Sequence, residues 1–186
     1  LQSDLAAPED KPVVVTYMTG REITLEGPAA RIVALTAADC EILYALGAED
    51  TLVGRGEYCD WPAGVLDVPV VQSGADTNIE QIIALRPQVL LMSDMAQTEE
   101  QIAALEDAGV HVVVSDAQDI AGVYDAIKML GALLGREKEA QALVDSMKEA
   151  FSAIGSQAGA NAGKKIYFEV SPLEWGLWAA GSDTFM

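Results

Sequence analysis

The sequence has few of the residues that build disulfide frameworks and metal sites. Among its 186 residues there are two cysteines, Cys40 and Cys59, and one histidine, His111. Two cysteines are too few for a disulfide framework, and their spacing is not that of a metal site. A single histidine excludes a three-histidine zinc centre and argues against a serine–histidine triad. We expect the cysteines to be free, with a bond between them or a place near a ligand as the alternatives.

Basic residues are also scarce. The chain has 11 Lys and Arg against 29 Asp and Glu, a formal net charge of -18. Such a surface repels phosphate backbones and anionic lipid headgroups, which excludes nucleic acid as a first expectation and favours a cationic partner surface. No apolar run reaches the roughly 18 residues that a membrane-spanning helix needs.

Apolar residues make up 51% of the chain, which is enough for a sizeable core. Residues 12–25 read as a β-hairpin around a glycine turn. After it, short apolar runs alternate with segments of helical period, and this alternation predicts an α/β fold with a doubly wound, mostly parallel sheet flanked by helices. The predicted strands are 31–35, 51–54, 68–71, 89–92 and 110–114, and the predicted helices are 39–46, 79–85, 98–108 and 120–134.

A longer amphipathic segment follows the alternation. Apolar residues recur at three- and four-residue steps from Glu137 to Ile154, which predicts one continuous helix. A run rich in Gly, Ala, Ser and Asn comes next, and then a predicted strand at 166–170. We therefore divide the chain into a flexible arm (1–11), an N-terminal α/β lobe (12–135), a long linker helix (136–158) and the start of a truncated C-terminal lobe (159–186).

Motifs of nucleotide binding and hydrolysis are incomplete. Gly54-Arg55-Gly56 lacks a third glycine and a following helix, and Lys165 stands where a phosphate loop needs Ser or Thr. No Gly-x-Ser-x-Gly elbow is present. His111 falls within a strand run and is expected to be a packed or edge histidine rather than a ligand.

Carboxylates follow the predicted strands, at the sheet edge where α/β proteins bind ligands. For Asp39 and Asp116 the alternative interpretation is helix capping. The full set is Asp39, Asp60, Asp76, Asp94 and Asp116.

The loop 57–62 carries two large aromatic residues, Tyr58 and Trp61, and ends at Pro62. Either Trp61 anchors the loop in the core, or the pair forms an aromatic wall for a flat or bulky ligand.

Motifs along nearly the whole chain resemble, in order, those of the cobalamin and ferric-siderophore substrate-binding proteins of ABC importers. The stretches that carry the resemblance are 19–25 with Pro28 and 31–35, 41–48, Val53-Gly54 with 58–62, 78–87, and 169–173 with 180–185. The resemblance implies two α/β lobes joined by a long helix, with the ligand held in the cleft between them. Members of that family continue well beyond the equivalent of residue 186, so we expect a chain truncated within the second lobe.

The implied ligand is a metal chelate, with a ferric siderophore and a corrinoid ranked equally. Haem ranks lower, with Tyr58 and Met95 as candidate axial ligands. No catalytic residue, protein-bound metal or resident cofactor is predicted. The expected ligand-binding residues are Thr36, Ala37, Asp39, Tyr58, Cys59, Trp61, Gly74 and Asp94, with Trp175 and Trp178 from the second lobe.

The resemblance also implies an exported protein, periplasmic or anchored as a cell-surface lipoprotein, that docks on an ABC permease. The resemblance makes Glu80 the predicted docking residue, because in that family the Glu at this motif position meets arginines of the permease; a helix-start carboxylate is the alternative. We expect the isolated chain to bind ligand negligibly and to self-associate. Two alternative functions are a small hydrolase-like α/β enzyme using the sheet-edge carboxylates, and a zinc or manganese binding protein.

Overall fold

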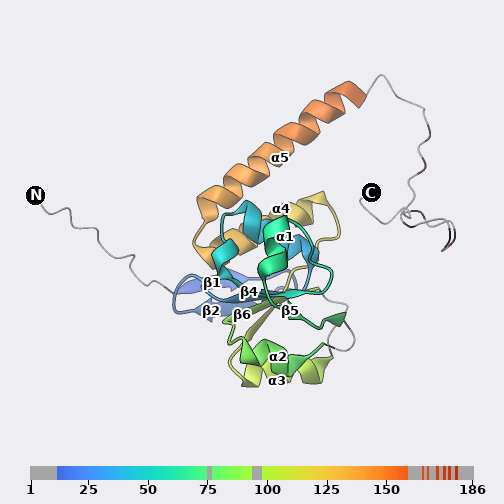
Figure 1. Cartoon of the computed structure of the whole chain (residues 1–186). Helices are drawn as coiled ribbons and strands as arrows, with labels where there is room; N and C mark the ends of the chain where they lie inside the picture. The colour runs from blue at the N-terminus through green and yellow to red at the C-terminus, as the bar shows by residue number, and fades with distance from the viewer. Residues whose placement is uncertain are drawn as a thin grey trace, which may run out of the picture.

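The computed structural model (Figure 1) describes residues 12–74, 77–93 and 98–158, with single positions between 165 and 179. The predicted arm, the predicted strand at 166–170 except Tyr167, and most of the predicted second lobe lie outside these residues. The same holds for Asp76, Met95 and three of the predicted ligand-binding residues, Asp94, Trp175 and Trp178.

A parallel sheet of five strands forms the centre of the described part, in the order β5-β4-β3-β6-β7. The chain runs outward from β3 to β4 and β5, then crosses to β6 and β7 on the other side of β3. This is the doubly wound arrangement that the β/α alternation predicts, so the predicted fold class is confirmed. The strands are β3 Ile32–Ala34, β4 Leu52–Gly56, β5 Val70–Val71, β6 Val89–Met92 and β7 His111–Val114.

Helices cover both faces of this sheet. In Figure 1, α1 (Ala37–Ala45) and α4 (Ile120–Leu134) lie on one side, and α2 (Ile79–Ala84) and α3 (Glu99–Asp107) lie on the other. Two short 3-10 helices, η1 (Glu49–Thr51) and η2 (Ala63–Asp67), precede and follow β4. Because both faces are covered, every residue of β3 and β6 is buried.

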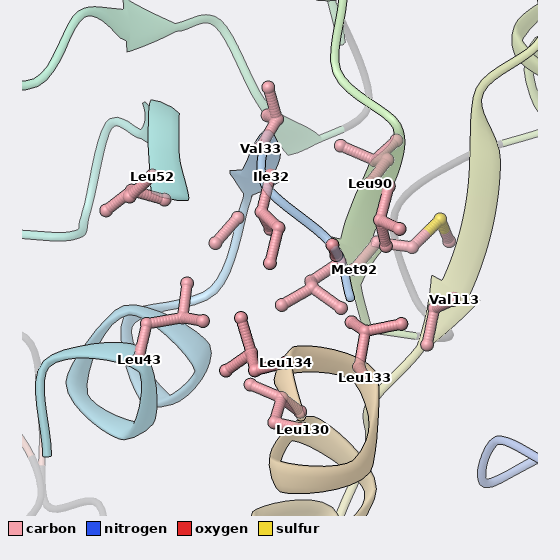
Figure 2. Packing of buried hydrophobic residues seen from close by; sticks show 14 of the residues in the cluster. Ile32, Val33, Leu43, Leu52, Leu90, Met92, Val113, Leu130, Leu133 and Leu134 are labelled. Carbon is pink, nitrogen blue, oxygen red and sulfur yellow. The ribbon is translucent and has the colours of Figure 1, made fainter. Parts of the chain in front are cut away.

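The main core lies between the sheet and the α1/α4 layer. Figure 2 shows Leu43 of α1 and Leu130, Leu133 and Leu134 of α4 next to the sheet, with Leu134 nearest Ile32 of β3 and Leu133 beneath Met92 of β6. Leu43, Leu130 and Leu133 have no exposed surface. Burying a leucine or isoleucine contributes about 1.5–3 kcal/mol each, so this layer supplies much of the stability of the lobe.

The predicted hairpin is present as β1 (Val13–Thr16) and β2 (Glu22–Leu25), paired antiparallel with Val13 opposite Leu25. Gly20 takes a positive φ of 81° in its turn, a conformation that glycine adopts without strain. The hairpin packs against α4, with Val15 and Leu25 in the core.

Helix α5 (Glu137–Ala158) begins against the lobe and then leaves it. Ala140 and Val144 are fully buried against α4, where a side chain on Gly131 would collide with the Ala140 methyl group. Beyond Met147, all residues from 148 to 157 are exposed, including Phe151 and Ile154. The second half of the helix therefore projects away from the sheet (Figure 1).

Among the described residues, no helix combines the length and the hydropathy required to cross a bilayer.

Candidate functional site

The carboxyl ends of the parallel strands meet at one edge of the sheet, and several predicted ligand-binding residues lie there. Thr36 and Ala37 follow β3, Tyr58 follows β4, and Gly74 follows β5. Because β5, β4 and β3 are neighbours in the sheet, the structure brings these three loops side by side. On the other side of β3, Ser115 follows β7 at the same edge.

Thr36 is the residue that caps helix α1. Its side-chain oxygen accepts a hydrogen bond of 3.1 Å from the Asp39 backbone N–H, and its hydroxyl donates one of 2.5 Å to the Asp39 carboxylate. The interpretation of Asp39 as the capping residue is therefore wrong, because Asp39 is already inside the first turn. Asp116 does not cap α4 either: the side chain of Asp119 accepts from the Gly122 N–H.

The Asp39 side chain is completely buried, and its Oδ1 has no hydrogen-bond partner among the described residues. Burial raises the pKa of Asp39 from 3.8 to about 6, and the hydroxyls of Thr36 and Ser115 partly offset that shift. Asp39 thus lies beneath the carboxyl edge rather than on its surface, and it supports the Thr36 turn from below.

The loop of residues 57–62, which we call the aromatic loop, is held by Arg55 of β4. This arginine is only 7% exposed and donates hydrogen bonds to the carbonyl oxygens of Cys59 (2.8 Å) and Val68 (3.2 Å). Gly56 permits the close approach of β3, because a side chain here would collide with the Leu35 carbonyl oxygen. Because these hydrogen bonds come from a buried, charged side chain, they fix the backbone of the aromatic loop although most side chains of the loop are exposed.

Tyr58 and Trp61 are 82% and 64% exposed. Trp61 therefore does not anchor the aromatic loop in the core; Cys59, which is fully buried, does. Trp61 and Pro62 instead line a groove of about 400 Å³ along the flank of α1, together with Glu41, Tyr44 and Ala45. Of the predicted loop residues, Tyr58 and Trp61 reach the surface and Cys59 does not.

Gly74 is half-buried in the loop after β5 and has a positive φ of 88°. Its carbonyl oxygen accepts a hydrogen bond of 2.6 Å from the Thr77 hydroxyl, which ties this loop to the start of α2. At the next residues, the Asn78 side chain caps α2 by accepting from the Gln81 N–H.

Glu80, the predicted docking residue, is exposed in the first turn of α2. Ile82 on the same helix is fully buried, whereas Ile83 is 37% exposed and does not face the core. His111 begins β7 and is half-exposed at the amino edge of the sheet, away from the loops described above. Within the described ranges no group of three or more His, Cys, Asp or Glu side chains could hold a metal ion.

Two arginines with structural roles were missed from the sequence. In the sequence, Arg55 stands out only as part of an incomplete glycine loop. Arg31 belongs to the motif at 31–35, and its guanidinium donates hydrogen bonds to the carbonyl oxygens of Leu85 and Arg86 at the end of α2. For Arg55 the available signal was a basic residue inside an apolar strand, because such a charge must find buried acceptors.

The sequence from the start of β3 onward matches a known family. Residues 32–186 match the family described as periplasmic binding protein. The chain belongs to this family. The family prediction made from the motifs is thereby confirmed.

Several individual proteins are similar to the chain. YvrC of Bacillus subtilis (strain 168), an uncharacterized ABC transporter substrate-binding lipoprotein, is 35% identical over 181 residues, 94% of this chain and 57% of that protein. The vitamin B12 binding protein BtuF of Vibrio cholerae aligns with a TM-score of 0.67 at 25% identity, over 77% of this chain and 56% of its own. A periplasmic heme binding protein from Pseudomonas aeruginosa aligns with a TM-score of 0.67 at 26% identity, over 71% of this chain and 48% of its own. The chain thus spans about half the length of the relatives it matches.

Proposed function

We propose that the protein is the substrate-binding component of an ABC importer, and that the carboxyl edge of its sheet is one wall of a cleft for a metal chelate. The observation that carries this proposal is the aromatic loop. Tyr58 is 82% exposed, although the carbonyl oxygen of the next residue, Cys59, is held from beneath by Arg55. An exposed aromatic side chain on a fixed backbone suits contact with a large, partly apolar ligand.

The ligand-contacting set in this proposal is Thr36, Ala37, Tyr58, Trp61 and Gly74, which reach or border the surface of the edge. Asp39 and Cys59 act beneath it, by holding the Thr36 turn and the aromatic loop. Asp94, Trp175 and Trp178 complete the predicted set and lie outside the described residues.

For the ligand, a corrinoid and a ferric siderophore remain the two leading candidates, and haem is third. Relatives named for vitamin B12 and for heme support the chelate class as a whole. The single histidine, His111, lies at the opposite edge, so an axial ligand for haem on this lobe would have to be Tyr58 or Met95.

The partner in this proposal is the importer's permease, contacted through Glu80, and the location is outside the cytoplasm, in a periplasm or as a surface lipoprotein. The net charge of -18 favours approach to a cationic permease surface. The family description and the lipoprotein relative support this location. We further propose that the protein is not an enzyme, since the family consists of binding proteins of transport systems.

The test is a titration of the full gene product, with whatever residues it carries on either side of 1–186, against cyanocobalamin, haemin and a panel of ferric siderophores. Calorimetry and absorbance should show micromolar or tighter binding of one class. Tyr58→Ala should weaken it at least tenfold, which corresponds to about 1.4 kcal/mol. Tyr124→Ala, a change on helix α4 and outside the aromatic loop, is the matched control. No binding to any of the three classes would overturn the proposal.

A further inference from the structure

Two thiols from different parts of the chain face each other beneath the aromatic loop. Cys40 lies in α1 and Cys59 lies in the loop after β4, and neither has any exposed surface. Both sulfur atoms are 3.9 Å from the same acceptor, the carbonyl oxygen of Ala34 at the end of β3. The fold therefore brings together the only two cysteines in the sequence.

The surroundings treat the two thiols differently. The hydrogen bond between the thiols, together with burial and the nearby Asp39, raises the pKa of Cys40. The same hydrogen bond, with one from Gly56 and the charge of Arg55, lowers the pKa of Cys59 against the opposing effect of burial. Cys59 is thus the thiol that more readily becomes the nucleophilic thiolate.

We propose that Cys40 and Cys59 are a redox pair that closes into an intramolecular disulfide in an oxidising compartment, covalently fastening the aromatic loop to α1. The compartment and the value of a fixed loop rest on the proposed function, because disulfides persist outside the cytoplasm and are rare within it. The pairing itself rests only on the geometry of the two thiols and Ala34.

The oxidant is a disulfide, either a small molecule such as oxidised glutathione or a thiol–disulfide oxidoreductase. The Cys59 thiolate attacks one sulfur of the oxidant, forms a mixed disulfide and expels the first thiolate. Cys40 then loses its proton and attacks the Cys59 sulfur, which breaks the mixed bond and releases the second thiolate. In balance, two protein thiols lose two protons and two electrons, and one disulfide becomes two thiols.

Both cysteines are buried, so the reaction must begin when the aromatic loop opens. Opening has to break the hydrogen bond from Arg55 to the Cys59 carbonyl oxygen and expose the Cys59 side chain. The neighbouring residues Glu57, Tyr58, Asp60 and Trp61 are already exposed, so their side chains do not resist it. Once closed, the bond would span a loop of about 20 residues and would limit that opening. The exposed aromatic side chains would then be presented on a covalently fixed backbone.

The experiment compares the purified chain after incubation with dithiothreitol and with oxidised glutathione. Non-reducing peptide mapping of the oxidised sample should recover one peptide pair joined through Cys40 and Cys59, with an intact mass lower by two hydrogen atoms. The thermal midpoint should rise by about 5–10 °C on oxidation. Hydrogen exchange of residues 57–62 should slow, with no change in α3.

Cys40→Ala and Cys59→Ala are the control variants, and each should abolish the oxidation-dependent shift. If either fails to fold, the comparison of the two redox states of the parent still decides the question. Two free thiols after oxidation, or only glutathione adducts or bonds between chains, would overturn the pairing. None of these measurements needs a ligand. A disulfide in a full gene product that binds none of the three chelate classes would therefore refute the proposed function and leave the pairing intact.

Discussion

The guanidinium of Arg55 donates a hydrogen bond of 2.8 Å to the carbonyl oxygen of Cys59, so strand β4 supports from beneath the loop that follows it. The same side chain reaches Val68, which leads into the neighbouring strand β5. One buried cation thus satisfies acceptors from two segments at the carboxyl edge. Loss of that cation leaves those carbonyl oxygens without a partner.

Arg55→Met should therefore lower the free energy of unfolding by about 2 kcal/mol or more, because buried hydrogen bonds to a charged group are lost. Urea unfolding monitored by fluorescence measures this loss of stability. Faster proteolysis within residues 57–62 should accompany the loss. Arg21→Met is the matched control: its ion pair with Glu106 is exposed and should contribute less than about 1 kcal/mol. Equal effects of the two changes would contradict a supporting role for Arg55.

The two helical glycines Gly131 and Gly155 should respond to alanine in opposite directions. A methyl group at Gly131 would collide with Ala140 and separate α4 from α5, at a cost of about 1–3 kcal/mol. At Gly155 a methyl group meets nothing within 4 Å, and alanine should stabilise the helix by about 0.5–1 kcal/mol. Denaturation of both variants measures the difference. Stabilisation by Gly131→Ala would show that the α4/α5 contact is looser than described.

Asp39 should make the lobe less stable as pH rises. Its folded pKa of about 6 exceeds the ordinary value of 3.8, so the folded state holds the proton more tightly than the unfolded state. The stabilisation is complete below pH 3.8 and is lost as pH rises through 6, and it amounts to about 2 kcal/mol between pH 4 and pH 8.

Asp39→Asn isolates this effect from the other carboxylates. The stability of the variant relative to the parent should increase by that amount across the same pH window, measured as urea midpoints at each pH. A constant difference between variant and parent would contradict the raised pKa.

Glu80→Ala should lower transport in cells without changing ligand affinity, because Glu80 is exposed in the first turn of α2, away from the aromatic loop. Uptake of labelled ligand and calorimetry on the full gene product are the paired measurements. Glu99→Ala, another exposed first-turn glutamate, is the control and should leave uptake unchanged. Normal uptake with Glu80→Ala would end the docking assignment.

The isolated chain 1–186 should self-associate and bind chelates at millimolar strength or not at all. Phe151 and Ile154, 47% and 65% exposed, extend the apolar stripe of α5 beyond the lobe, and such surface tends to be covered by another molecule. Sedimentation should show a dimer that Phe151→Glu with Ile154→Glu dissociates, whereas Ser152→Glu does not. A monomeric parent with micromolar ligand affinity would contradict both expectations.

Local pattern was sufficient for most of the secondary structure. Residues 120–134 were predicted as a helix with the bounds that α4 has, because Asp119 caps its first turn and Gly135 ends it in a left-handed conformation. The five strands were each found within a few residues, since burial on both faces demands short continuous apolar runs. The order of the elements then constrained the fold class, and the motifs along the chain indicated the family.

The candidate site depended on contacts that no local pattern contains. These contacts depend on β3 lying next to β4 in the order β5-β4-β3-β6-β7. They leave Trp61 exposed and Cys59 buried, enclose Asp39 beneath Thr36, and bring Cys40 to Cys59 at Ala34. For a residue just after a strand, the sequence does not show whether its side chain lies on the surface of the carboxyl edge or is buried beneath that edge. Only the packing of α1 against the loop after β4 decides which, because burial is set by neighbours distant in the chain.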